Sequence, residues 1–269
     1  MTYQTICVGL LHEDARNPVV METAIQMALL QGAHLTAVHL IPTLNIPIYV
    51  GIAFPDDMMG AYYEAADANG EELRKTFESL CNSAGLESHE WVGGTRSILT
   101  PLEELAPVTD LFVLSQHSAG EHDWLIGEAS LRLGVPVFAV PEAGQYETFG
   151  RSVLLAWAPR RECTRAVRDA MPMLQAADQV VVLRGDVGED ARDVGVGAYL
   201  ARHGVQANIK HVTTNAISIG DAILNAVTDE GCDTIVMGAY GHSRIREMSF
   251  GGATRHVLHH MTVPTLLSH

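Results

Sequence analysis

The chain has few basic residues for its length. Its 269 residues include 17 Lys and Arg against 32 Asp and Glu, which gives a formal net charge of −15 at pH 7. Proteins that bind nucleic acids hold phosphates with clustered cations, and no basic stretch here offsets the acidic excess. Arginines gather only at positions 160, 161, 165 and 168, with the spacing of one helix face. We therefore expect no nucleic-acid partner.

Cysteine is also scarce. Cys7, Cys81, Cys163 and Cys232 lie far apart and form no C-x-x-C pair. That pattern indicates free thiols in a reducing compartment rather than a disulfide framework. None has a local activating pattern, so small buried residues are expected rather than nucleophiles.

Long apolar runs are missing. No run approaches the roughly 18 residues that a membrane helix needs, and the N-terminus has no basic region of the signal-peptide type. Hydrophobic residues make up 47% and charged residues 18% of the chain, as in a globular protein. These features predict a cytoplasmic protein without a membrane partner.

Recognisable catalytic motifs are absent from the sequence. It has no G-x-S-x-G elbow, no phosphate loop with its lysine and no H-E-x-x-H. We expect no catalytic residue and, at most, slow ATP hydrolysis. His256 and His260 are four residues apart, a spacing that can hold a metal on a helix, but no acidic residue or cysteine is near them in sequence. No metal site is predicted.

The sequence contains two copies of one unit. Three apolar segments recur in the same order, which predicts domains at 1–145 and 148–269. The matching pairs are Thr5–Leu10 with Ser152–Trp157, Asp110–Ser115 with Asp233–Gly238, and Gly134–Val140 with Thr262–Ser268.

Each copy alternates short apolar runs with helix-length segments, the pattern of parallel strands covered by helices. This predicts a doubly wound α/β unit that occurs twice, with ligands at the carboxyl ends of the strands. The expected strands are 4–10, 34–41, 86–92, 110–115, 136–140, 152–157, 179–184, 206–212, 233–238 and 264–268. The expected helices include 56–84, 161–176, 188–203, 217–230 and 250–261.

A glycine-rich loop follows the expected strand 233–238 and opens a helix. Glycine lets the backbone approach a ligand, and the free N–H groups of a helix start attract anions. The loop is therefore a candidate phosphate site, although the same glycines could serve only the turn, and its polar side chains could be a solvated loop. The candidate binding residues are Gly238, Gly241, His242, Ser243, Arg244, Gly251, Gly252, Ala253 and Thr254.

The spacing Gly238-x2-Gly241-x9-Gly251, between a strand and a helix, resembles that of nucleotide-binding universal stress proteins. Segments 161–170 and 263–267 are also similar, and the whole chain resembles a tandem universal stress protein. The resemblance implies two Rossmann-like (adenine nucleotide alpha hydrolase-like) domains, each with a five-stranded parallel sheet and helices on both faces. It also implies domain pairing and a regulatory role in the stress response. Some members bind ATP with little or no hydrolysis.

Two departures from that family weaken the second copy's site. Gly252 stands where binding members have Ser or Thr, although Thr254 could supply a hydroxyl. Ala158 stands where they have an Asp that contacts the nucleoside. Loss of one charge-assisted hydrogen bond costs about 1.5–3 kcal/mol, roughly tenfold or more in affinity.

The first copy departs further. Ser115 and Ser118 replace the early glycines, and with Gly127 taken as the third glycine the loop is one residue short. The helix that follows is expected to be about one turn shorter, and Glu128 at its start would repel a phosphate. We expect the first site to be lost, so that ATP or a related adenine nucleotide binds only in the C-terminal domain.

Alternatives remain open. In the leading interpretation the two copies pack against each other, edge strand to edge strand, near 136–140 and 264–268. The chain could instead be a nucleotide-free interaction or dimerisation protein. The apolar strip 40–59 could be a lid over a lipid-like ligand in the N-terminal domain, or a packing or homodimer surface. The sequence does not identify a protein partner.

Overall fold

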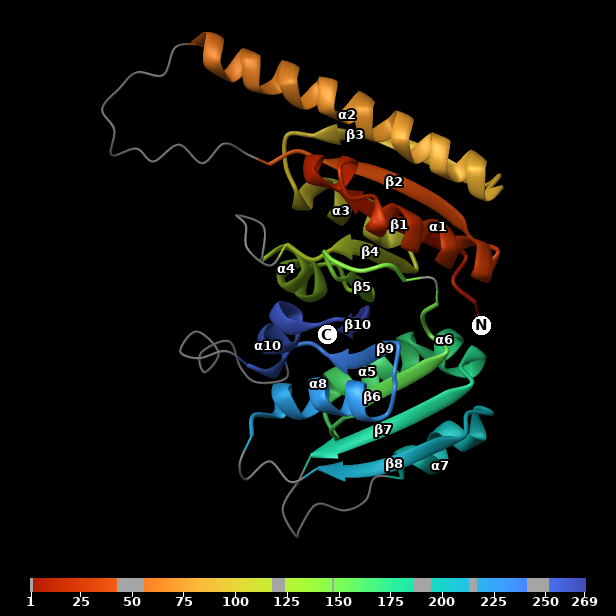
Figure 1. The fold of residues 1–269 in the computed structure, drawn as a ribbon. Helices are drawn as coiled ribbons and strands as arrows, with labels where there is room; N and C mark the ends of the chain where they lie inside the picture. Colours follow the sequence, from red (N-terminus) through yellow and green to blue (C-terminus); the bar gives the residue numbers. More distant parts are fainter. Residues whose placement is uncertain are drawn as a thin grey trace, which may run out of the picture.

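A computed structural model describes residues 2–42, 56–117, 124–146, 148–185, 195–212, 217–240 and 252–269. Within these ranges ten strands form one continuous sheet in the order β3-β2-β1-β4-β5-β10-β9-β6-β7-β8 (Figure 1). Each half of the chain contributes five adjacent strands, so the predicted tandem α/β architecture is confirmed.

The first half contains β1 (Thr5–Leu10), the 3-10 turn η1 (His12–Ala15), α1 (Val19–Gln31), β2 (His34–Leu40), α2 (Asp56–Ala84), β3 (His89–Thr95), α3 (Leu99–Leu105), η2 (Ala106–Val108), β4 (Leu111–Ser115), α4 (Leu125–Arg132) and β5 (Val137–Val140). The second half contains β6 (Ser152–Trp157), α5 (Arg161–Asp169), α6 (Met171–Ala176), β7 (Gln179–Gly185), α7 (Val196–Arg202), β8 (Ala207–Val212), α8 (Ile219–Asp229), β9 (Thr234–Gly238), α10 (Ala253–His260) and β10 (Thr265–Ser268).

The strands within each half are parallel and their central members are buried on both faces. This burial explains why their sequences are continuous Val, Ile and Leu runs rather than alternating patterns. Helices α1, α2, α5, α6 and α7 cover one face, and α3, α4, α8 and α10 cover the other (Figure 1).

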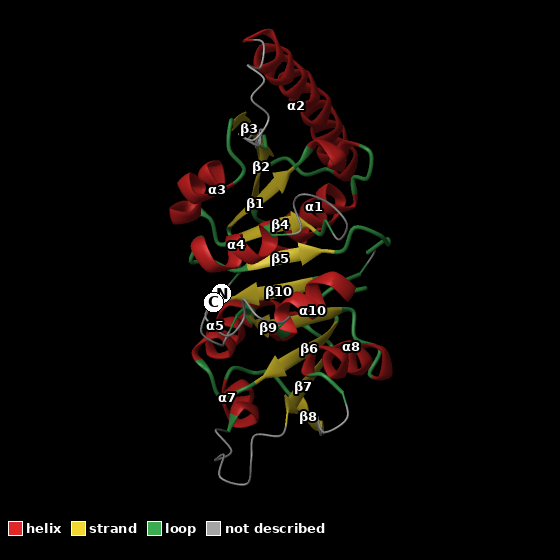
Figure 2. Cartoon of the chain, turned by 90° about the vertical axis from the view of Figure 1, so that its left-hand side faces the viewer, coloured by secondary structure: helices red, strands yellow, loops and turns green. Residues whose placement is uncertain are grey.

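The two halves join edge to edge. Strand β10 pairs antiparallel with β5, with Leu266 opposite Phe138 in the register. Figure 2 shows the two arrows side by side and pointing in opposite directions. The predicted pairing near 136–140 and 264–268 is therefore correct, and it brings α4 and α10 to the same face of the sheet.

Three predicted elements differ from the structure. The helix expected at 188–203 is described only as α7, which begins at Val196 after Gly195 in a left-handed conformation (φ +62°), and residues 186–194 lie outside the described residues. Strand β3 begins and ends three residues later than 86–92, and it continues past Gly94 in close contact with β2: a Cβ there would lie 2.6 Å from the carbonyl oxygen of His39. The single helix expected at 161–176 is two helices that meet at Ala170. Pro172, which has no N–H donor, stands in the first turn of α6 and explains the break.

The four cysteines are unpaired, as predicted, and only Cys163 is not fully buried. No helix in the described ranges has the length and apolar character needed to span a membrane.

Candidate functional site

The candidate site lies at the carboxyl ends of β6 and β9. From β6 the chain adds β7 and then β8 on one side, and it later returns to place β9 on the other side. Ligands of open α/β sheets bind at such a point of reversal. Trp157 ends β6, and Gly238 ends the neighbouring β9.

Gly238 is packed tightly against the first turn of α5. A Cβ at this position would lie 2.6 Å from the backbone nitrogen of Cys163 and 2.7 Å from the carbonyl carbon of Glu162. Because those neighbours are backbone atoms, they cannot move aside cheaply. Helix packing therefore explains a glycine at 238 without any ligand.

Cys163 lies between the ends of β6 and β9. Burial raises the pKa of its thiol, while hydrogen bonds from the backbones of Ala158 and Gly238 act in the opposite direction. Part of the strand-end backbone therefore faces this sulfur. Ala158 itself brings no carboxylate to the site, and its carbonyl accepts the N–H of Arg160 at 2.7 Å.

Helix α10 begins beside this point. Its N-cap, Gly252, has an extended backbone, and no side chain of the described residues caps it. The first N–H groups of such a helix are available to an anion. Thr254 is 5% exposed, and its Oγ1 accepts the backbone N–H of Tyr240 at 3.2 Å. Its hydroxyl proton remains able to donate elsewhere.

The structure therefore places four of the predicted binding residues, Gly238, Gly252, Ala253 and Thr254, at one edge of the sheet. The others lie outside the described residues: Gly241, His242, Ser243, Arg244 and Gly251. So do residues 43–55 of the apolar strip that could have formed a lid in the first half.

In the first half, Gly127 is not the counterpart of Gly251. Helix α4 begins at Leu125, so Gly127 is its third residue rather than a residue before the helix. The connection from β4 to α4 spans nine residues (116–124), against fourteen (239–252) from β9 to α10. The predicted deficit of one residue is thus too small. The predicted loss of a helical turn is wrong, because α4 and α10 have eight residues each.

The sequence analysis missed a buried carboxylate in the first half. Asp14 is 3% exposed, and its Oδ2 accepts the backbone N–H of Leu11 at 2.8 Å. An acidic residue that closes a turn three residues back is a recognisable local signal. Its carboxylate stabilises the turn after β1.

A second missed residue is Asp221 on α8. Its Oδ1 lies 2.9 Å from Nε2 of His256, and the rings of His256 and His260 stack with centroids 4.5 Å apart. A hydrogen bond from Ser218 lowers the pKa of the Asp221 carboxyl, and His256 adds to the effect. The contact spans 35 positions in sequence, so no local motif could show it. No group of three potential metal ligands occurs in the described part of the chain.

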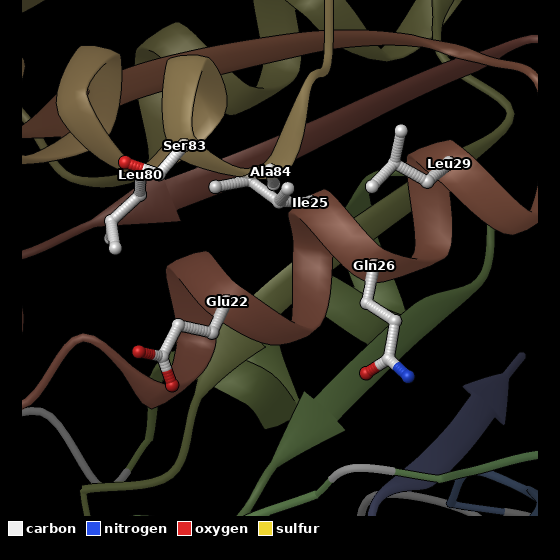
Figure 3. A pocket seen from close by; sticks show the side chains of 7 residues that line it. All are labelled: Glu22, Ile25, Gln26, Leu29, Leu80, Ser83 and Ala84. Carbon is white, nitrogen blue, oxygen red and sulfur yellow. The ribbon is translucent and has the colours of Figure 1, made fainter.

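A cavity of about 420 Å³ lies elsewhere, between α1 and α2 (Figure 3). Its lining residues come from along α1 and from the last turns of α2. Its lining is mostly apolar and consists of Glu22, Ile25, Gln26, Leu29, Leu80, Ser83 and Ala84. It is separate from the candidate anion site.

Comparison with known proteins finds a family match in the second half of the chain. Residues 152–269 match the model of the Universal stress protein family. Universal stress protein Slr1230 of Synechocystis sp. (strain ATCC 27184 / PCC 6803 / Kazusa) is 25% identical over 203 residues, 71% of this chain and 69% of that protein.

Solved structures share the fold over nearly the whole chain. A universal stress protein from Archaeoglobus fulgidus DSM 4304 gives a TM-score of 0.73 at 16% identity, and covers 97% of this chain and 95% of its own. A functionally unknown protein from Pseudomonas aeruginosa PAO1 gives 0.61 at 13% identity, with 97% and 92% covered. The match over residues 152–269 confirms the resemblance to this family that the sequence indicates, and the solved structures confirm the fold.

Proposed function

We propose that this is a stress-response regulatory protein that binds an adenine nucleotide such as ATP, because residues 152–269 match the model of the Universal stress protein family. We assign the ligand to the second half only, with little or no hydrolysis. One observation carries the proposal: the start of α10, which no side chain of the described residues caps, lies at the carboxyl edge of the sheet, where the strand order reverses.

The residues of α10 would bind the phosphates. No side chain of the described ranges caps its start at Gly252, and Thr254 keeps a hydroxyl proton to donate. The candidate loop residues Gly241 to Gly251 would complete the site. We assign domains to 1–145 and 148–269, the first without a nucleotide site because its corresponding connection is five residues shorter. Four unpaired cysteines support a cytoplasmic location.

Equilibrium dialysis with labelled ATP, with and without magnesium, tests the proposal. Wild type should show saturable uptake, and the double variant Gly241→Val, Gly251→Val should lose it. Gly93→Val is the matched control, since nothing lies within 4 Å of a Cβ at that exposed position in the first half. Equal uptake by all three proteins would refute the assignment. Phosphate release above that of the double variant would show hydrolysis.

A second function is supported by the packing of Gly238. Since α5 alone requires glycine there, and Ala158 supplies no carboxylate, the frame can also be explained as a nucleotide-free interaction scaffold. That reading predicts no saturable ATP uptake by wild type in the same dialysis experiment.

A further inference from the structure

Helix α10 is capped at its C-terminal end by a residue of the first half. The side chain of Gln116 donates from Nε2 to the carbonyl oxygen of Leu258 at 2.5 Å. The last four carbonyls of a helix have no partner within the helix, so this amide satisfies one of them. Gln116 is only 7% exposed, and the bond is therefore shielded from water.

Hydrogen bonds of its own backbone and side chain fix the position of Gln116. It directly follows β4, its backbone N–H donates to the carbonyl of Val140 at 2.7 Å, and its Oε1 accepts the N–H of Glu142 at 3.2 Å. Both side-chain groups of the amide are thus used. Gln116 thus links the carboxyl end of β4 directly to α10.

A second contact acts at the other end of α10. Tyr240 has a φ of +53°, a conformation that residues with a Cβ rarely adopt, and its N–H binds Thr254 in the first turn of α10. Its ring lies against Gly127 of α4 in the first half. A Cβ on Gly127 would collide with the tyrosine hydroxyl and lie 3.3 Å from Cζ. Glycine at 127 therefore makes room for this ring.

We propose that Gln116 and Gly127 of the first half are positioning residues for the start of α10 in the second half. On this view the residue after β4 and the first turn of α4, which lack the glycine spacing, support the site of the other half. The consequence for ligand affinity rests on the proposed function. The positioning of α10 does not, and it can be measured without a ligand.

The first test is Gly127→Ala in the full-length chain, followed by hydrogen exchange of the α10 amides and by dialysis with labelled ATP. We expect exchange in α10 to be about three- to tenfold faster and ATP affinity to fall by a similar factor. Gly60→Ala is the matched control. It makes the same change inside helix α2 with no atom within 4 Å of the new Cβ, and should leave both readouts unchanged.

Two further variants separate positioning from general damage. Gln116→Glu keeps the size and the acceptor but replaces the donor that faces Leu258, so α10 should again exchange faster. Tyr240→Phe introduced into Gly127→Ala removes the hydroxyl that the new Cβ meets, and should return α10 exchange toward that of the Tyr240→Phe single variant.

The outcomes distinguish the two proposals. If wild type takes up no ATP, the nucleotide assignment fails, while the exchange experiment still decides the positioning role. The positioning role is overturned if Gly127→Ala and Gln116→Glu leave α10 exchange unchanged, or if exchange rises equally throughout the chain. A change confined to α10 and the adjoining end of β9 supports it.

Discussion

The two halves differ in how closely the first helix follows the first strand. In the first half, eight residues (11–18) separate β1 from α1, and in the second only three (158–160) separate β6 from α5. The short connection brings the start of α5 onto the end of β9, where only glycine fits, at position 238. The corresponding end of β4 accommodates the buried side chain of Ser115.

This difference changes how the glycine motif is interpreted. Gly238 is needed by the second half whether or not a ligand binds, because its Cβ position is occupied by α5 backbone. The evidence for an anion site therefore comes from the start of α10 rather than from the first glycine. The first half lacks the glycine spacing and the first glycine for separate reasons. The spacing is absent because the connection after β4 is shorter. A glycine is not required at the end of β4 because the connection after β1 is longer, so α1 does not pack onto that strand end as α5 does.

The largest effect is expected from Gly238→Ala. The added Cβ would meet two backbone atoms at 2.6 and 2.7 Å, so α5 or β9 must shift. We predict a loss of about 1–3 kcal/mol in the free energy of unfolding, measured by urea denaturation. Ser115→Ala, at the equivalent strand end, should cost less than about 1 kcal/mol, because its hydroxyl makes only a 3.5 Å contact with the carbonyl of Gln116. Equal losses in the two variants would disprove the packing account.

A smaller effect, on binding alone, is expected from Ala158→Asp. This change returns to the end of β6 the carboxylate that nucleotide-binding family members carry. We predict that ATP affinity rises about tenfold, measured by equilibrium dialysis, as expected for one charge-assisted hydrogen bond. Ala158→Asn matches the size without the charge and should give a smaller gain. No gain in either variant would argue that the ligand does not reach this strand end.

The sequence was sufficient to predict the strands, the two halves and the way in which the halves pair. Continuous apolar runs identified the strands, and the repeat identified the two halves together with the edges that pair. These features depend on local composition and on burial of every strand, so they are visible in one sequence. The predicted helix boundaries were wrong where a single residue decides them, as Pro172 does between α5 and α6.

The site was less predictable because its supports are distant in sequence. Gln116 binds α10 across 142 positions, and Asp221 reaches His256 across 35. Neither contact leaves a periodic or local pattern. The alignment of Gly127 with Gly251 also failed, because a glycine inside a helix was taken for one before it. Among the described residues, the packing of Tyr240 on α4 explains why position 127 is glycine.

The halves also differ in the strand next to the central strand, which is β2 in the first half and β7 in the second. His39 on β2 and Arg184 on β7 occupy equivalent places, each paired with the last residue of the central strand, and they are 4% and 7% exposed. Arginine stays charged at all relevant pH values. Burial lowers the pKa of His39, nearby His12 lowers it further, and Asp67 opposes the shift. The first half thus buries an imidazole whose charged form is disfavoured, where the second half buries a guanidinium.

The smallest predicted effect follows from the contrast between His39 and Arg184. It is a pH dependence of the free energy of unfolding. The folded protein favours neutral His39, so as pH falls below about 6.5 the unfolded chain binds a proton that the folded chain resists. The stability that His39 contributes is therefore present above that pH and is lost as the pH falls toward the lower, folded-state pKa. Urea denaturation between pH 5 and pH 7.5 should show this slope, and His39→Gln should flatten it. His211→Gln, the same change at an exposed position on β8, should keep the wild-type slope. If His39→Gln retains it as well, the pH dependence arises from another group, and the contrast between His39 and Arg184 has no energetic consequence.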